Sequence, residues 1–163
     1  MIREDIRNIA IIAHVDHGKT TLVDEMLKQG GIYRENQATT DRVMDSGDLE
    51  RERGITILAK NTSIHYKDTK INIVDTPGHV DFATEAERAM PVLDCAILVI
   101  SATAGIQAHT QTLWDLLRRY EVPTFLFINK MDLPGKEKRE LLTQLQSMLH
   151  PGCVDFTAPE EEW

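Results

Sequence analysis

The 163-residue sequence has few cysteines and little positive charge. Its two cysteines, Cys95 and Cys153, have no Cys or His residues at metal-ligand spacing around them, which favours a pair of reduced thiols. Lys and Arg number 18 against 26 Asp and Glu, so the formal net charge is -8. An acidic surface has no general attraction for phosphate backbones, and we therefore expect no DNA binding and only local contacts with any RNA.

Long hydrophobic runs are also missing. No apolar stretch approaches the roughly 20 residues that cross a bilayer, and the charged start Met1-Ile2-Arg3-Glu4-Asp5 differs from a signal peptide. We therefore expect a cytoplasmic protein without membrane contact. With 42% hydrophobic residues, the chain has the size and composition of one compact domain.

Short apolar runs alternate with amphipathic segments, which is typical of an α/β fold with a mostly parallel sheet and helices on both faces. The expected strands are 9–15, 55–66, 71–74, 95–100 and 124–128, and the expected helices are 20–29, 82–90, 107–120 and 137–149. The strands before and after Lys67-Asp68-Thr69 are close enough for an antiparallel hairpin. The polar segment 32–54 predicts a long loop, and loops of that length are usually functional. We assign residues 1–157 to one domain and 158–163 to a frayed tail.

The first chemical motif is Ala13-His14-Val15-Asp16-His17-Gly18-Lys19-Thr20, which has P-loop spacing with Ala in place of the first Gly. It lies between an expected strand and an expected helix, as a P-loop requires. Backbone N–H groups in such a loop surround a β-phosphate, and the helix N-terminus adds a favourable dipole. Lys19 would contact the β- and γ-phosphates, and Thr20 would offer a hydroxyl to magnesium. The alternative is an ordinary strand-to-helix turn.

The second motif is Asp75-Thr76-Pro77-Gly78, which follows an expected strand. A carboxylate there can reach a magnesium ion, usually through water. Gly78 lets its N–H approach a γ-phosphate closely. The alternative is a plain Asp-Thr-Pro-Gly turn.

The third motif is Asn129-Lys130-Met131-Asp132, at the carboxyl end of a buried strand, where open α/β sheets bind ligands. The Asp132 carboxylate can accept hydrogen bonds from both N1–H and the exocyclic amino group of guanine. Adenine would leave that carboxylate unpaired, which disfavours a P-loop ATPase or kinase. The alternative is a loop with a helix-capping Asp.

In this order, the three motifs resemble those of the translational GTPases, the family of elongation factors Tu and G. The family's forms appear in 13–21, in Arg53-Gly54-Ile55-Thr56-Ile57 and in Asp75-Thr76-Pro77-Gly78-His79. Up to His79 the chain is most similar to the BipA/TypA GTPases, notably in 42–46 and 58–62. From there to Phe156 it is closer to the tetracycline-resistance ribosomal protection type.

The resemblance implies a GTP and GDP site, a magnesium ion and two switch segments, 32–56 and 75–88. The implied nucleotide-binding residues are His14, Val15, Asp16, His17, Gly18, Lys19, Thr20, Thr21, Asp75, Gly78, Asn129, Lys130 and Asp132. The implied magnesium ligands are Thr20, Thr56 and Asp75.

His79 is the catalytic residue that the resemblance implies, because in the family it positions the attacking water after the ribosome moves it inward. Val15 and Ile55 correspond to an apolar gate that otherwise keeps it out. The alternative is a solvated residue at a helix start. Arg51 and Arg53 are more simply explained as solvated loop charges than as charge stabilisers.

The family continues into a sixth strand, a Ser-Ala loop that contacts guanine, a closing helix and further domains. Here the candidate loop is Thr157-Ala158, and no helix follows it. We therefore expect a monomer that has weakened guanine affinity, binds ribosomes poorly and has an exposed strand edge open to self-association. Two functions stay open: a slow GTPase accelerated by the ribosome, and a nucleotide-binding module with little turnover.

Overall fold

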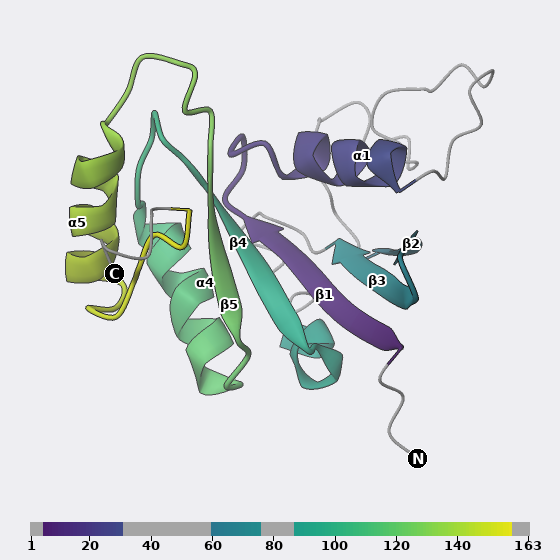
Figure 1. Ribbon diagram of the computed structural model, residues 1–163. Helices are drawn as coiled ribbons and strands as arrows, with labels where there is room; N and C mark the ends of the chain where they lie inside the picture. The colour runs from purple at the N-terminus through teal and green to yellow at the C-terminus, as the bar shows by residue number, and fades with distance from the viewer. Residues whose placement is uncertain (1–4, 31–59, 76–86, 158–163) are drawn as a thin grey trace.

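The computed structural model describes residues 5–30, 60–75 and 87–157, which form a sheet with helices on both sides (Figure 1). The elements in chain order are β1 (Ile6–Ala13), α1 (Lys19–Gln29), β2 (Lys60–Tyr66), β3 (Thr69–Asp75), the 3-10 turn η2 (Met90–Val92), β4 (Cys95–Ser101), α4 (Ala108–Arg119), β5 (Thr124–Asn129) and α5 (Lys138–Met148). The predicted strands and helices in these ranges are confirmed with shifted ends. The predicted loop 32–54 and most of the predicted helix 82–90 lie outside the described residues.

The five strands form one sheet in the order β2-β3-β1-β4-β5. β1 pairs in parallel with β3 and β4, and β4 pairs in parallel with β5, while β2 and β3 form the predicted antiparallel hairpin. The predicted mostly parallel α/β fold is therefore confirmed. Since β1, β3, β4 and β5 run the same way, their carboxyl ends meet at one edge of the sheet.

Alternate residues of the central strand β1 enter two separate cores. Ala10 and Ile12 belong to the core under α4 and α5, whereas Ile9, Ile11 and Ala13 belong to the core under α1. A strand covered on both faces is apolar at successive positions, which explains its unbroken hydrophobic run. The two cores hold β1 rigidly at the centre of the sheet, and the loop after it starts from a fixed point.

Leu98 on β4 is fully buried and tests how tightly this core is packed. Replacing it by alanine leaves a cavity and should lower the free energy of unfolding by about 2–5 kcal/mol. Leu133 is 48% exposed, so the same change there should stay within about 0.5 kcal/mol. Denaturant unfolding of both variants measures the difference, and equal values would contradict this packing.

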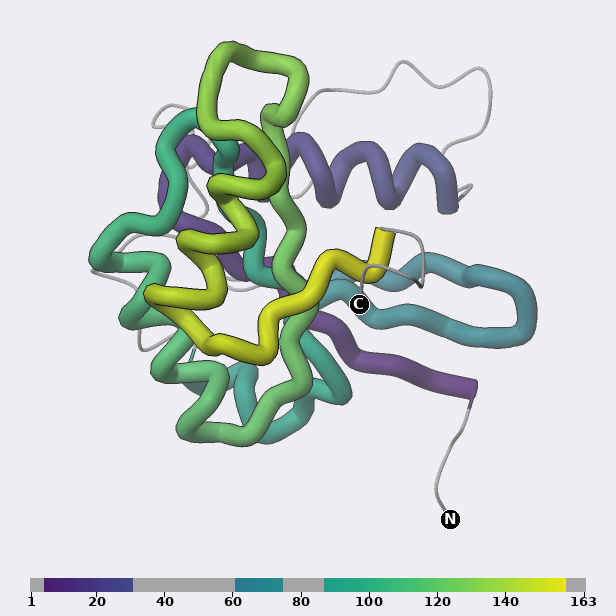
Figure 2. Tube along the Cα trace, turned by 60° about the vertical axis from the view of Figure 1, so that its left-hand side comes forward, coloured from purple at the N-terminus to yellow at the C-terminus, as the bar shows by residue number. Residues whose placement is uncertain are grey.

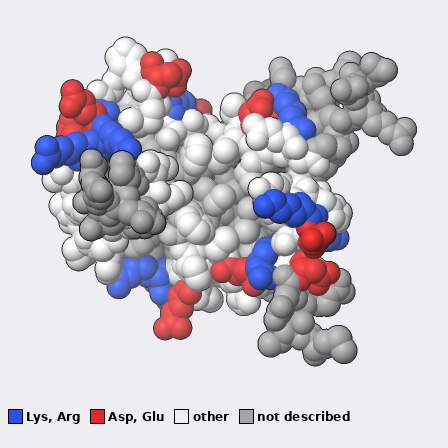
Figure 3. Space-filling model, viewed as in Figure 1, with Lys and Arg blue, Asp and Glu red and all other residues white. Residues whose placement is uncertain are grey.

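β5 forms one edge of the sheet, and no sixth strand lies beside it in the described residues. Residues 153–157 instead cross β5 without pairing (Figure 2), and the Phe156 ring packs edge-on against Phe125 at 6.1 Å between centroids. Phe125 and Phe127 remain 54% and 42% exposed. Figure 3 shows no charged side chain across the middle of the sheet in that view. Within the described residues, β5 is therefore an edge strand of the sheet.

Both cysteines are free, as the sequence predicted. Burial raises the pKa of the Cys95 and Cys153 thiols, and nearby Asp94 raises the former further. Each thiol is thereby kept protonated and unreactive near neutral pH. None of the helices in the described ranges has the length and apolarity that a membrane span requires.

Candidate nucleotide site

The loop between β1 and α1 bends through two left-handed residues. Asp16 has φ 64° and Gly18, which caps α1, has φ 91°. β1 ends at Ala13, two residues before the predicted end at residue 15, so His14 and Val15 belong to this loop. A Cβ on Gly18 would overlap the side-chain amide of Asn129. Glycine is therefore required there both for the backbone angle and for the close approach of β5.

Lys19 is the first residue of α1 and only 8% exposed. The first turn of α1 contains no acidic residue, and no side chain caps the helix start. The first N–H groups of a helix have no acceptor within that helix, and the helix dipole places partial positive charge there. With the Lys19 ammonium added, this end of α1 is arranged to hold an anion.

The third motif, which starts at Asn129, forms hydrogen bonds with this loop. The Asn129 side chain donates a hydrogen bond from Nδ2 to the His17 carbonyl oxygen, 3.0 Å away. Lys130, whose φ is 61°, donates from Nζ to the Asp16 carbonyl oxygen at 2.7 Å. Two segments more than a hundred residues apart in sequence are thus joined at the carboxyl edge of the sheet, and Asp132 stands exposed in the turn that follows.

Some of the remaining predicted site residues lie at this edge of the sheet, and the others lie outside the described residues. Asp75 ends β3 and is the register partner of Ile11 on β1, so its backbone lies at the same edge. Thr20 and Thr21 lie in the first turn of α1. Thr56, Gly78 and His79 lie outside the described residues.

The possible metal ligands near this edge of the sheet suit a magnesium ion that is bound mainly by a nucleotide. Magnesium prefers oxygen ligands, keeps several waters and is usually held by one or two protein groups together with phosphate oxygens. The described residues contain no group of three or more His, Cys, Asp or Glu that could hold a metal alone. Thr20, in the first turn of α1, therefore suits a magnesium site shared with a nucleotide better than a protein-only cage.

The His17 side chain points into the protein, a position that the sequence did not predict. Its ring is 3% exposed, and Nδ1 lies 3.2 Å from the Ser101 amide nitrogen and 3.3 Å from the Val99 carbonyl oxygen. The pKa of this ring is lowered, chiefly by burial and further by His14 and Lys130, although the hydrogen bond to the Val99 carbonyl and nearby Asp16 act in the opposite direction. The ring therefore anchors the loop to β4, and only the backbone of His17 is available to a phosphate.

His109 on α4 is a residue that the sequence analysis missed. Its ring is 8% exposed and packs on His14, with 5.4 Å between ring centroids. The available signal was its spacing, since positions 109, 113 and 117 follow one helical face whose other members are leucines. A histidine on that buried face should have been considered as a neighbour of the loop.

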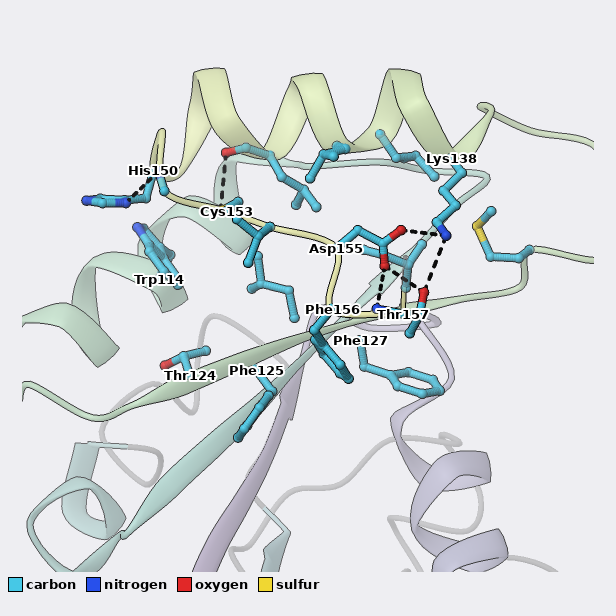
Figure 4. A pocket seen from close by; sticks show the side chains of 18 residues that line it. Trp114, Thr124, Phe125, Phe127, Lys138, His150, Cys153, Asp155, Phe156 and Thr157 are labelled. Atoms are coloured by element: carbon cyan, nitrogen blue, oxygen red, sulfur yellow. Dashed lines mark hydrogen bonds and ion pairs between the residues drawn. The ribbon is translucent and has the colours of Figure 1, made fainter. Parts of the chain in front are cut away.

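The candidate guanine loop at Thr157 is fixed by local polar contacts (Figure 4). Asp155 accepts hydrogen bonds from the Thr157 amide and hydroxyl, and it forms an ion pair with Lys138 of α5. Lys138 and Thr157 together lower the pKa of Asp155 to about 2. Thr157 lines a groove of ≈ 660 Å³ that also reaches Met131, the neighbour of Asp132, while Ala158 lies outside the described residues.

A comparison with known protein families identifies the family to which this chain belongs. The profile described as the elongation factor Tu GTP binding domain matches residues 4–158. The chain belongs to this family. It is a translation-factor-type GTPase domain, as its three motifs predicted, and the family fold agrees with the sheet described above.

Relatives of known name support the assignment. The large ribosomal subunit assembly factor BipA of Bacillus subtilis is 47% identical over 99% of this chain, and that of Escherichia coli is 54% identical over 98%. A putative chloroplastic TypA-like elongation factor of Arabidopsis thaliana is 52% identical over 82% of the chain and 20% of its own length. The chain spans 26% of the length of either BipA protein. The predicted likeness to BipA and TypA is confirmed, and the tetracycline-resistance likeness of the second half stays a prediction.

A solved structure agrees with the fold. A protein of Thermus thermophilus superposes with a TM-score of 0.80 at 29% sequence identity, covering 90% of this chain and 22% of that protein. The five-stranded sheet and its helices are therefore arranged as in a known protein.

Proposed function

We propose that this domain binds GTP with magnesium at the carboxyl edge of the sheet and hydrolyses it to GDP and phosphate. The observation that carries the proposal is the pair of hydrogen bonds from Asn129 and Lys130 to the P-loop carbonyls of His17 and Asp16. These bonds bring the phosphate-binding and base-recognition motifs together in one site. An ordinary strand-to-helix turn and an unrelated capping loop would have no reason to meet in this way.

The phosphates would lie over the start of α1. Lys19 supplies a full positive charge, and the backbone N–H groups of the loop and the first helical turn supply donors. Because charge and donors are already arranged by the fold, little reorganisation is needed when the phosphates bind. Magnesium, held by Thr20, Asp75 and Thr56 together with the phosphates, would neutralise charge that develops during hydrolysis.

Guanine would lie beside the turn after β5. The Asp132 carboxylate would accept its N1–H and amino group, and the Asn129 and Lys130 side chains would hold that turn against the P-loop. Thr157 would approach guanine from the groove at the end of β5, as the analogue of the family's Ser-Ala loop. The hydrogen bonds that Thr157 makes with Lys138 and Asp155 support this role, because they hold its side chain in place.

His79 would orient the water that attacks the γ-phosphate, with 32–56 and 75–88 as the switches. Ribosomes are the proposed activator, because the BipA relatives are named as ribosomal subunit assembly factors. For the chain as given, we propose residues 1–157 as the nucleotide domain and a monomeric, cytoplasmic protein with weak ribosome binding.

Phosphate release from GTP, followed with and without ribosomes, tests the proposal. Ribosomes should accelerate release, and His79→Ala should reduce the stimulated rate by about a hundredfold with little change in GDP affinity, since water orientation is lost while binding groups remain. His65→Ala, at an exposed position on β2, is the control. A stimulated rate unaffected by His79→Ala would refute the catalytic role.

The second candidate is a guanine-nucleotide-binding module without useful turnover. It is favoured by the unpaired edge of β5 within the described residues. Tight GDP binding with no ribosome-dependent phosphate release would select this module over the enzyme.

A further inference from the structure

Three histidine rings form a continuous stack from the P-loop to α4. His14 lies between the other two, with ring centroids 5.3 Å from His17 and 5.4 Å from His109. The planes meet at 81° and 66°, so both contacts are edge-to-face. Edge-to-face aromatic contacts of this kind stabilise a structure by about 0.5–1.5 kcal/mol beyond their burial. The stack joins the loop that would hold the phosphates to the first turn of a helix on the opposite core.

The two outer rings of the stack are buried and anchored. His17 is held against β4 by the Ser101 amide, and His109 belongs to the buried face of α4, with Leu113 one turn further along. Within the described residues, His14 Nδ1 and His17 Nε2 are buried with no hydrogen-bond partner. The two neighbouring rings pack against the His14 ring and therefore help to set its orientation.

The two outer rings, His17 and His109, lie where a positive charge is disfavoured. The Ser101 N–H is a fixed donor that faces Nδ1 of His17 and opposes a proton on that atom, whereas the Val99 carbonyl oxygen, 3.3 Å away, would accept from it. His109 lies at the positive end of α4, where a cation is disfavoured. Of the charged groups that face His17, Lys130 also opposes protonation and Asp16 favours it, while burial opposes it most.

We propose that His109 is a positioning residue for the P-loop, acting through His14 and His17 and only while its own ring is uncharged. The inference rests on the proposed nucleotide site. An uncharged stack would fix the loop from His14 to His17 in the conformation that presents its backbone to the phosphates. A proton on His109 would loosen that loop, so acidification would weaken nucleotide binding below the ordinary histidine pKa of about 6.5.

Two substitutions separate ring packing from titration. His109→Phe keeps an aromatic ring that cannot be charged, and His109→Ala removes the ring. Fluorescent GDP titrations between pH 7.5 and 5.5 should show affinity falling about tenfold for the unaltered protein and no more than about threefold for His109→Phe. His109→Ala should bind about tenfold more weakly already at pH 7.5. Titration of the GDP phosphates is common to all proteins and cancels in the ratios.

The controls distinguish failure of this inference from failure of the proposed site. His65→Phe, the same change at an exposed position on β2, should keep the pH dependence of the unaltered protein. If Lys19→Ala abolishes binding while His109→Phe falls as steeply with acid as the unaltered protein, His109 has no positioning role. If Lys19→Ala binds normally, the proposed site itself is wrong. Should His109→Ala not fold, the slope of His109→Phe still decides.

Discussion

Replacement of Lys19 by alanine is expected to weaken binding of both GTP and GDP by about a thousandfold, or about 4 kcal/mol. The ammonium is nearly buried at the start of α1, where it would contact the phosphates through charge-assisted hydrogen bonds. Removing one partner of such a pair leaves phosphate charge desolvated and unpaired, and this penalty is larger than the loss of an exposed ion pair.

Lys28 provides the matched control, because it lies on the same helix with a half-exposed side chain that pairs with neighbouring Glu25. Lys28→Ala should leave nucleotide affinity unchanged. Fluorescence titration measures both variants, and thermal melting shows that each is folded. Equal affinity of the Lys19 and Lys28 variants would place the phosphates elsewhere.

Asp132→Asn should change the preferred base from guanine to xanthine, with a swing in relative affinity of about 10⁴-fold. Asparagine can still accept the base N1–H, but its amide N–H₂ then faces the amino group of guanine, donor against donor. Xanthine has a carbonyl oxygen at that position and accepts the amide hydrogen. In the Asp132→Asn protein, guanine therefore meets a donor–donor mismatch, whereas xanthine gains a hydrogen bond.

Competition of GDP and xanthosine diphosphate for a fluorescent nucleotide measures this swing. Asp115→Asn, an exposed position on α4, is the control for the loss of one negative charge and should keep the guanine preference. The assignment of Asp132 to the base is wrong if the Asp132→Asn protein still prefers GDP. The phosphate contacts would be unaffected by that result, because they lie on β1 and α1.

The sequence by itself determined the strand and helix order and the chemistry of three motifs. Unbroken apolar runs predict buried parallel strands because both faces of such a sheet are covered, and β1 and β4 followed that rule. The P-loop spacing predicts a strand, a turn and a helix since the phosphate-binding geometry is local, set within a few residues by Gly18 and the start of α1. Such features depend on neighbours in sequence and are therefore readable from it.

Contacts between distant segments were decided only by the tertiary structure. The bonds from Asn129 and Lys130 to the P-loop, the stack of His14, His17 and His109, and the exposed β5 edge all depend on how strands more than eighty residues apart are ordered in the sheet. A histidine on an apolar helical stripe has the same sequence pattern whether it faces leucines or other histidines. Its neighbours, and hence its charge, are set when the chain packs.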